Sequence, residues 1–425
     1  MSKWVHTTLQ DICCPEKGSI ISGPFGSNIS SKFFVDKGVP VIRGNNLSLS
    51  LDKFYDDGFV FVSKEKADEL NCYALEGDLL FTGAGTIGQV GILEAPLKYE
   101  KYVISNKQLR ARLDAKKVDR LYAYYWFSSA WMQDYFIRNN KGSTVPLISL
   151  SELKDAPISY PEDVSEQRQI VAVIEALSRK IETNRSICTD LESMAKTIYD
   201  YWFTQFDFPD ADGKPYRSSG GAMEWNAHLG RLLPKDWKVH YLSEIFDTKL
   251  GGTPDTKEES FWNGDIPWLS SSEVAQSPIL SSEKTITSQG MKCSSTSFAE
   301  KGTVLLSITR YIRPAILGID ACFNQSVVAI IPNKKYRAEY LYQVILSQVD
   351  RYMTLRRGAQ QPHINKEIVD KTLVVCPPGE ILQKYYDAVE PLYSMHMNAA
   401  KENRELTKLR DWLLPLLMNG QATVN

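Results

Sequence analysis

The stretch Gly142-Ser-Thr-Val-Pro-Leu-Ile148 returns in the second half of the chain as Gly358-Ala-Gln-Gln-Pro-His-Ile364. The offset between the two copies continues without a gap, so that Pro161 aligns with Pro377. A unit of roughly 200 residues is too long for a solenoid repeat or a propeller blade. The repeat therefore indicates a duplicated domain followed by a duplicated helix. A duplicated binding module suits a ligand that has two half-sites.

The bulk composition is that of a globular protein with two to three domains. The chain has 425 residues, of which 43% are hydrophobic and 24% are charged. No apolar run approaches the ~20 residues of a membrane span, and we expect a cytoplasmic protein. The seven cysteines form no CxxC pair and are expected to be reduced, and the five histidines lack metal-ligand spacing. We therefore expect no metal site.

The charge is unevenly distributed although the net charge is only −2. Residues 1–141 carry a net charge of +2 and residues 231–363 carry +3, whereas residues 162–206 carry −3. Mild basicity of the repeated globular parts favours an anionic partner, although most surface charge is only a solvated face.

Each half begins with a β-rich module. Short apolar runs bounded by Gly, Asn and Asp predict strands. These runs are 39–43, 59–62, 78–81 and 89–93 in the first half and 266–269, 303–308, 315–317 and 326–331 in the second. An aromatic-rich helix is predicted after the strands of each half, at about 121–137 and about 338–355, and both helices end in basic residues.

Each half then changes to a helical period. Apolar residues alternate in steps of four and three, which predicts a heptad seam. The predicted seam residues are Ile170, Ile174, Leu177, Ile181, Asn184, Leu191, Ile198 and Trp202 in the first copy and Leu382, Val389, Leu392, Asn403, Leu406 and Leu413 in the second. An isolated helix cannot bury such a stripe, so we expect the two helices to form an antiparallel coiled coil. A buried Asn on each seam could fix the register.

These patterns predict an α+β protein with a pseudo-twofold internal repeat. The predicted domains are a β-rich module at 1–160, a central helix at 161–206, a connector at 207–233, a second β-rich module at 234–377 and a C-terminal helix at 378–425. If the helices act as a spacer, inserting one heptad near Asn184 and at its counterpart should lengthen the gap between the two half-sites of the ligand and leave the half-sites unchanged.

One motif is compatible with an enzyme. Gly83-Ala-Gly-Thr-Ile-Gly88 matches the glycine spacing of a dinucleotide-binding loop. Such a loop must open a helix, but Gln89–Pro96 resembles another short strand. We interpret the motif as the tip of a strand–loop–strand unit and keep a nucleotide-dependent enzyme as the alternative.

The other common catalytic motifs are missing. The sequence contains no G-x-x-x-x-G-K-[ST], no H-E-x-x-H and no G-x-S-x-G, and no Asn/Asp-Pro-Pro-aromatic tetrapeptide. A chain of this length without such motifs favours a recognition component. A coiled-coil scaffold for protein partners is the third hypothesis.

Residues suited to DNA recognition recur in both halves. Arg and Lys bind phosphate or guanine, whereas Asn and Gln can pair with adenine. The candidates are Ser27, Asn28, Arg43, Asn45, Thr82, Thr86, Lys107, Arg138, Lys141 and Ser143 in the first half and Ser271, Arg310, Tyr311, Arg313, Arg356, Arg357, Gln360 and Gln361 in the second.

The central region resembles that of type I restriction–modification specificity (S, or HsdS) subunits. The resemblance is carried by Phe208-Pro-Asp-Ala-Asp-Gly-Lys-Pro-Tyr-Arg-Ser-Ser-Gly-Gly221, followed by Leu233-Pro-Lys-Asp-Trp237. The Glu166-Gln-Arg-Gln-Ile170 entry into the first long helix is similar as well. The order of module, helix, module and helix covers the whole chain.

The resemblance implies that each module reads one half of a bipartite double-stranded DNA sequence and that the helices dock two modification subunits. Those subunits would carry S-adenosylmethionine and methylate adenine, and two restriction subunits could add ATP-driven translocation and cleavage. The chain itself would be non-catalytic and would hold no cofactor or metal. No membrane partner is implied.

Overall fold

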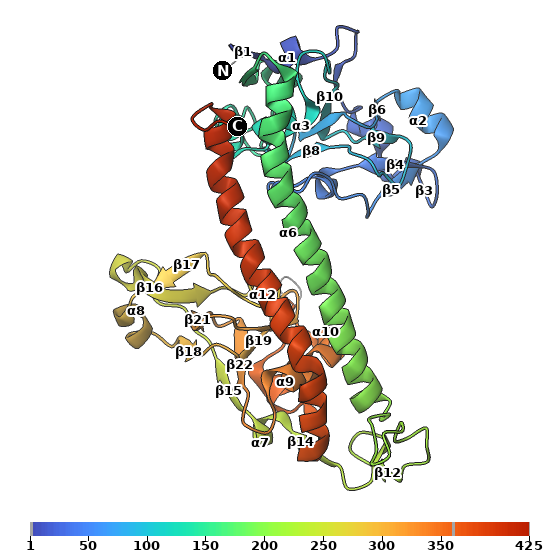
Figure 1. Ribbon diagram of the computed structural model, residues 1–425, viewed down its shortest axis with the longest axis vertical. Helices are drawn as coiled ribbons and strands as arrows, with labels where there is room; N and C mark the ends of the chain where they lie inside the picture. Colours follow the sequence, from blue (N-terminus) through green and yellow to red (C-terminus); the bar gives the residue numbers. More distant parts are fainter. Residues whose placement is uncertain (1–2, 359–361, 425) are drawn as a thin grey trace. The chain divides into compact units, whose positions relative to one another are not determined.

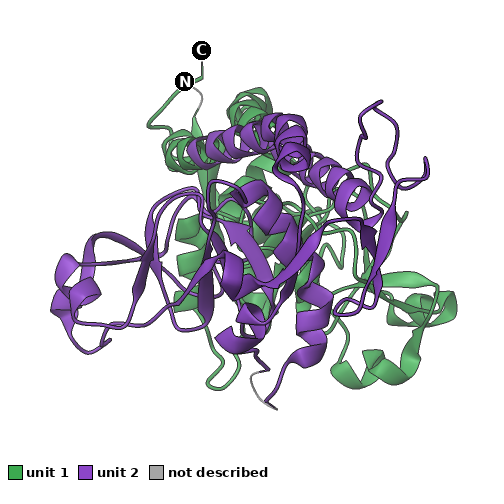
Figure 2. Ribbon diagram, turned by 90° about the horizontal axis from the view of Figure 1, so that it is seen from below, with its two compact units in different colours: residues 1–181, 406–425 green, residues 182–405 purple. Residues whose placement is uncertain are grey.

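The structure is a computed structural model that describes residues 3–358 and 362–424. The chain divides into two compact units, shown in Figure 2. Unit 1 comprises residues 1–181 and 406–425, and unit 2 comprises residues 182–405. Each unit contains a β-rich module together with parts of both long helices, so each unit mixes residues that are far apart in the sequence.

Three sheets form the module of unit 1, which we call module 1 (Figure 1). One sheet pairs β1 (Trp4–Thr8) with β11 (Pro157–Pro161). The four-stranded sheet has the order β2 (Ile20–Ser22), β10 (Gln108–Ala111), β7 (Leu79–Thr82), β8 (Val90–Ile92). The five-stranded sheet has the order β3 (Phe34–Val35), β5 (Val60–Val62), β4 (Val39–Ile42), β9 (Tyr102–Ile104), β6 (Tyr73–Ala74).

Module 2, in unit 2, repeats this topology except that the sheet corresponding to the five-stranded one has four strands. One sheet pairs β14 (Lys238–Tyr241) with β23 (Leu373–Cys376). A second sheet has the order β15 (Asp247–Leu250), β22 (Val327–Ile331), β19 (Val304–Ser307), β20 (Arg313–Ile316). A third has the order β17 (Lys284–Ile286), β16 (Trp262–Leu269), β21 (Ala321–Phe323), β18 (Ser297–Ala299).

The pairing registers confirm the duplication that the sequence predicts. In module 1, β4 runs parallel to β9, with Ile42 opposite Ile104. In module 2, β16 runs parallel to β21, with Leu269 opposite Phe323. The other pairs in these sheets are antiparallel, so a parallel pair at the same place in both modules is a specific match.

The short helices also correspond between the modules. Module 1 contains α1 (Leu9–Ile12), α2 (Lys64–Leu70), α3 (Arg120–Phe127), α4 (Ala130–Arg138) and α5 (Leu150–Lys154). Module 2 contains α7 (Leu242–Ile245), α8 (Ser288–Lys292), α9 (Ala338–Ser347), α10 (Val349–Leu355) and α11 (Lys366–Asp370).

The two predicted aromatic-rich helices are each broken into two. In module 1, Ser128 closes α3 and Ser129 precedes α4 in extended conformation. The Ser129 hydroxyl donates a hydrogen bond to the Trp126 carbonyl, so the side chain competes with the helical hydrogen bonds. In module 2, Gln348 separates α9 from α10. The prediction of one continuous helix was therefore wrong in both halves.

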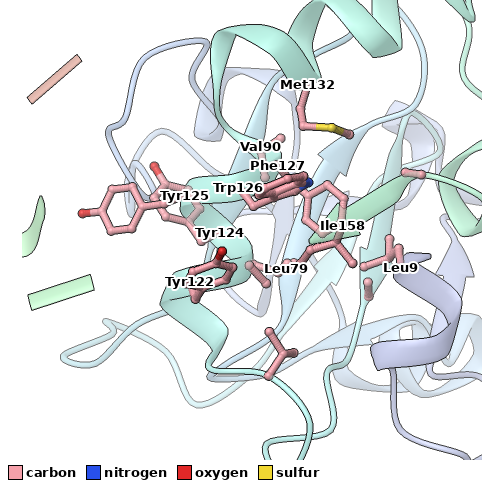
Figure 3. Packing of buried hydrophobic residues seen from close by; sticks show 14 of the residues in the cluster. Leu9, Leu79, Val90, Tyr122, Tyr124, Tyr125, Trp126, Phe127, Met132 and Ile158 are labelled. Atoms are coloured by element: carbon pink, nitrogen blue, oxygen red, sulfur yellow. The ribbon is translucent and has the colours of Figure 1, made fainter. Parts of the chain in front are cut away.

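The core of module 1 is rich in aromatic residues that come largely from α3. Figure 3 shows Tyr122 and Phe127 on the side of α3 toward strand residues such as Leu79, whereas Tyr124 and Tyr125 point to the other side of the helix. Buried tyrosine hydroxyls need partners, and that of Tyr122 donates to the Ser159 carbonyl at 2.9 Å. The same core includes Ile170 and Ile174 of the first long helix, so the helix is part of the unit and not a free arm.

Two long helices, α6 (Val164–Tyr199) and α12 (Gly379–Met418), pass through both units. Within unit 1, Ile174 near the start of α6 shares a cluster with Leu417 near the end of α12. Within unit 2, the side-chain amide of Asn184 in α6 donates to the Glu402 carboxylate in α12 at 2.7 Å. As the residue numbers of α6 increase, those of its contact residues in α12 decrease, which confirms that the two helices pack antiparallel. Asn184 is buried, as expected for a polar residue on the seam.

The segment predicted as a connector is folded. α6 ends in a π-helical turn (Asp200–Thr204), and β12 (Met223–Asn226) pairs with β13 (Arg231–Pro234) as a hairpin. Phe208 stacks on Trp237, with the ring centroids 5.1 Å apart. Trp237 and Leu233 thereby join the core of unit 2, so this segment is anchored by its aromatic residues.

No helix in the described ranges is long and apolar enough to cross a membrane.

Candidate nucleic-acid interface

A turn after β4 carries the first group of candidate residues. Asn46 is 0% exposed, and its side-chain amide oxygen (Oδ1) accepts a hydrogen bond from the Arg43 backbone N–H at 2.9 Å. The amide of Asn46 donates to the carbonyls of Tyr55 and Asp57 at 2.9 and 2.8 Å. Asn46 therefore holds the turn from inside, whereas the neighbouring Asn45 is exposed to solvent. The Arg43 guanidinium donates to the Gly58 carbonyl at 3.3 Å, at the far end of the same loop.

Thr82 is not available to DNA. Its side chain is buried, and its hydroxyl donates to the Gln89 side-chain carbonyl at 2.9 Å. Gln89 in turn donates to the carbonyls of Gly44 and Leu47 at 3.2 and 3.0 Å. Thr82 and Gln89 thus tie the β7–β8 hairpin to the turn at Arg43–Asn46. The burial of Thr82 argues against a direct contact of its side chain with DNA, because all four residues of β7 are buried.

The glycine-rich motif forms the tip of the β7–β8 hairpin, as the sequence interpretation predicts. No helix opens after it, and β8 returns antiparallel to β7. The Gly85 N–H donates to the Pro146 carbonyl and the Ile148 N–H donates to the Gly83 carbonyl, at 2.9 and 2.8 Å. The repeated Gly142–Ile148 stretch is therefore the support of the hairpin tip. The helix start that a dinucleotide site requires is missing here.

One further loop bonds to this tip, and a second loop packs against the first. The Lys107 carbonyl accepts from the Gly83 N–H at 2.8 Å, which places the exposed Lys107 and Thr86 in the same region. Gly23 donates to the Gln108 carbonyl at 2.9 Å. A Cβ atom at Gly23 would lie 1.8 Å from the Ser105 carbonyl oxygen, so only glycine fits this approach.

The Gly23 loop carries Ser27 and Asn28, which are exposed as predicted, and also Phe25. The Phe25 side chain is 82% exposed on this anchored loop, and sequence reasoning missed it. Its place between Gly23 and Gly26, directly before Ser27 and Asn28, was the available signal. An exposed aromatic ring can stack on a base or contact a thymine methyl group.

The remaining cationic candidates of module 1 have acidic neighbours. Arg138 lies 3.8 Å from Asp134, and Lys141 lies 4.0 Å from Glu152. Both are exposed ion pairs of low strength, so each cation can exchange its partner for phosphate. Ser143 is exposed on the loop that supports the hairpin tip.

In module 2, the hairpin of β19 and β20 corresponds to the β7–β8 hairpin of module 1, and its tip makes the equivalent backbone hydrogen bonds. The Arg310 N–H donates to the Pro362 carbonyl at 2.9 Å and the Ile364 N–H donates to the Ile308 carbonyl at 3.0 Å. The Ser271 and Thr309 hydroxyls lie 3.4 Å apart, which brings the loop after β16 to the hairpin tip. Gln360 and Gln361 lie outside the described residues.

The loop end of module 2 is cationic. Tyr311 is 70% exposed, and the Arg313 guanidinium lies 5.6 Å from the centroid of its ring. Arg356 donates to the Arg310 carbonyl at 2.9 Å. Among the described residues, no ion pair involves Arg310, Arg313, Arg356 or Arg357, so their charges are not neutralised locally. Guanidinium groups without a local counter-charge are suited to an anionic ligand, so these four arginines stay candidates for DNA contacts.

The predicted seam residues are used within the chain itself. Ile170, Ile174, Ile181, Asn184, Leu191, Leu382 and Val389 are buried, and Leu177, Ile198, Trp202, Leu392, Asn403, Leu406 and Leu413 are half-buried. They are therefore poor candidates for direct contacts with a partner. On α6 and the turn after it, Ile187, Met194 and Tyr201 are instead exposed at 37%, 52% and 39%.

The fold and the two loop ends define a class of protein, namely an internally duplicated recognition protein. Each half presents one set of polar loops on a β-rich module, and each module is followed by a long helix.

The chain belongs to the family of type I restriction modification DNA specificity domains, whose model matches residues 1–193 and 234–408. It is 26% identical, over 82% of its length and 78% of the relative, to the type I restriction enzyme MjaIX specificity subunit of Methanocaldococcus jannaschii. It is 22% identical, over 76% of its length and 82% of the relative, to the HindI specificity subunit of Haemophilus influenzae.

The fold is also similar to a crystal structure of the type I restriction-modification S subunit from M. genitalium. The TM-score is 0.54 at 16% identity, and the match covers 98% of this chain and 96% of that one. This likeness supports the architecture and not the detailed chemistry of the loops.

Proposed function

We propose that this chain is the DNA-specificity subunit of a type I restriction–modification complex and reads a bipartite double-stranded target, one half-site with each module. The observation that carries the proposal is the construction of the same loop end twice, with matching hydrogen bonds at Gly85 and Arg310. Two similar frames that carry different side chains suit two different half-sites. Family membership supports the ligand class.

The chain acts without catalysis of its own under this proposal. Modification subunits would supply S-adenosylmethionine and adenine methylation, and restriction subunits would supply ATP-dependent translocation and cleavage. The hairpin at Gly83–Gly88 supports this division, because it does not form the strand-to-helix turn of a nucleotide site. The complex would act on DNA in the cytoplasm.

The exposed stripe on α6 supports docking of a modification subunit. Ile187, Met194 and Tyr201 recur every seven residues and are not covered by the rest of the chain. A single face of exposed apolar residues is unusual on a monomer and is typical of an interface. Two modification subunits would be the simplest complement to a duplicated chain.

The docking proposal predicts that Met194→Glu weakens assembly with the modification subunit, because it places a charge in an apolar contact. Size-exclusion chromatography of the mixed subunits measures the loss, and the thermal unfolding of the chain alone should not change. Ser193→Glu, at the exposed neighbouring position, is the matched control and should assemble normally. Equal assembly of the two variants would contradict this docking surface.

Methylome sequencing tests the function itself. Cells that lack other adenine methylation would express the chain with its modification subunit, and we expect one bipartite methylated motif. Exchanging residues 1–160 for those of another family member should change one half-site only. Methylation without a sequence motif, or no dependence on this chain, would contradict the proposal. A chain that assembled with protein partners but never engaged DNA would instead be a scaffold.

A further inference from the structure

We propose that Arg310 reads a guanine in the half-site of module 2. This inference rests on the proposed function and deepens it, because it assigns one side chain to one chemical class of base. It begins from a structural equivalence between the two hairpin tips. In module 1 the tip pairs Gly83 with Ile148 and Gly85 with Pro146, whereas in module 2 it pairs Ile308 with Ile364 and Arg310 with Pro362.

The residue between these pairs matches as well. Ala84 bridges Leu147 in module 1, and Thr309 bridges His363 in module 2. Three consecutive positions therefore coincide, and Arg310 occupies the place that Gly85 occupies in module 1.

The backbone at this place has a positive φ in both modules. The φ of Gly85 is +100° and that of Arg310 is +56°. Glycine adopts such a conformation without steric cost, whereas an arginine there is strained. Module 1 shows that glycine fits the frame, so the backbone does not require an arginine. Strained residues of this kind cluster at functional sites.

The surroundings hold the backbone of Arg310 and leave its side chain available. Its N–H is bound to the Pro362 carbonyl, and its own carbonyl accepts from Arg356 at 2.9 Å. The guanidinium is exposed, and within the described ranges it makes no hydrogen bond or ion pair. A fixed backbone that carries a free guanidinium is well prepared for directional recognition.

A guanidinium can bind guanine through two parallel hydrogen bonds to O6 and N7 in the major groove. It can also bind phosphate, which carries no sequence information. Arg313 and Arg357 are exposed on the same side of the module and could contact phosphate, whereas the Arg356 guanidinium donates to the carbonyls of Met353 and Arg310. We assign the base contact to Arg310, whose backbone has a positive φ and is held by two hydrogen bonds.

The test uses Arg310→Gly and Arg310→Lys in the assembled complex with the modification subunit. Glycine relieves the backbone strain, so the thermal stability of the Arg310→Gly chain should be equal or higher. In competition binding, discrimination at one guanine position should fall roughly 5- to 150-fold. Lysine keeps the charge but loses the two-point fork, so discrimination should fall with a smaller loss of total affinity.

Asp236→Gly is the matched control, because Asp236 also has a positive φ of +69° and lies in the turn before β14. It should leave the motif unchanged. An unchanged motif for Arg310→Gly would overturn the assignment, and so would a uniform loss of affinity at every sequence, which marks a phosphate contact. A wild-type complex without any sequence preference would overturn the proposed function instead.

Discussion

Asn45 and Asn46 are adjacent in the sequence and should fail in opposite ways when each is changed to alanine. Asn46 is 0% exposed and makes three hydrogen bonds to the loop that runs from Arg43 to Asp57. Asn45 is exposed, and no hydrogen bond of its side chain is found among the described residues. Asn46→Ala therefore tests a residue that holds the loop in place, and Asn45→Ala tests a residue predicted to contact DNA.

The magnitude follows from the partners that Asn46→Ala would leave behind. The Arg43 N–H and the carbonyls of Tyr55 and Asp57 would each lose a partner. An unsatisfied buried polar group costs about 1–3 kcal/mol, and water that enters the small cavity would recover part of this. We expect a local destabilisation of about 2–4 kcal/mol. Asn45→Ala should cost less than about 0.5 kcal/mol, as is usual for an exposed side chain.

Hydrogen–deuterium exchange of the full chain measures the anchor. Amides in residues 43–58 should exchange faster in Asn46→Ala, by a factor of roughly 30 or more, since 1.4 kcal/mol corresponds to tenfold. The same amides should be unchanged in Asn45→Ala. In the methylome, both variants should relax the half-site of module 1 and leave that of module 2 intact. Unchanged exchange in Asn46→Ala would refute the argument that burial makes this residue an anchor.

Two further predictions concern stability and titration. Lys53→Met should destabilise unit 1 by about 2 kcal/mol in chemical denaturation, because Lys53 pairs with Glu94 and with the nearly buried Glu175. The exposed pair of Lys371 and Glu367 provides the control, and Lys371→Met should show no resolved change in the free energy of unfolding. Burial raises the pKa of the Cys13 thiol to about 12, so at pH 8 a thiol reagent should modify exposed Cys293 and spare Cys13 until the chain unfolds. The pKa of Cys13 in the folded chain lies above its unfolded value of about 9. Ionisation of this thiol should therefore leave the free energy of unfolding unchanged below pH 9 and lower it progressively as the pH rises toward 12. Rapid modification of Cys13 in the folded chain would contradict its burial.

The sequence was sufficient to predict the architecture because the architecture depends on periodic patterns. Strand runs such as 39–43 and 326–331, and heptad spacing from Ile170 onward, are repeated physical constraints that many residues share. The repeated Gly-x-x-x-Pro-x-Ile stretch marked a structural support, and the structure shows it under both hairpin tips. The domain boundaries drawn from the sequence stay predictions, since the compact units divide both long helices.

The candidate site was less predictable, because a residue can contact a ligand only if its side chain points outward, and the residue type does not determine that. Thr82 ends a strand in which all four residues are buried, so the usual alternation of inward and outward side chains is absent. Asn45 and Asn46 have the same chemistry, and only the path of the loop to Asp57 decides which is buried. Phe25 drew no prediction from the sequence, and only the approach of Gly23 to Ser105 shows that its loop leaves the ring exposed.

The difference between the two hairpin tips indicates how one frame can serve two half-sites. The N–H groups of Gly85 and Arg310 donate to equivalent proline carbonyls, so this backbone contact forms with either side chain. Module 1 places glycine at this point, with the predicted DNA contacts Asn45 and Lys107 on neighbouring loops, whereas module 2 places an exposed guanidinium there. A backbone contact that forms with either glycine or arginine allows the tip residue to change, at the energetic cost of the positive φ. Gly85→Arg should therefore fold, since a Cβ at Gly85 meets no atom within 4 Å, although its positive φ of +100° adds strain.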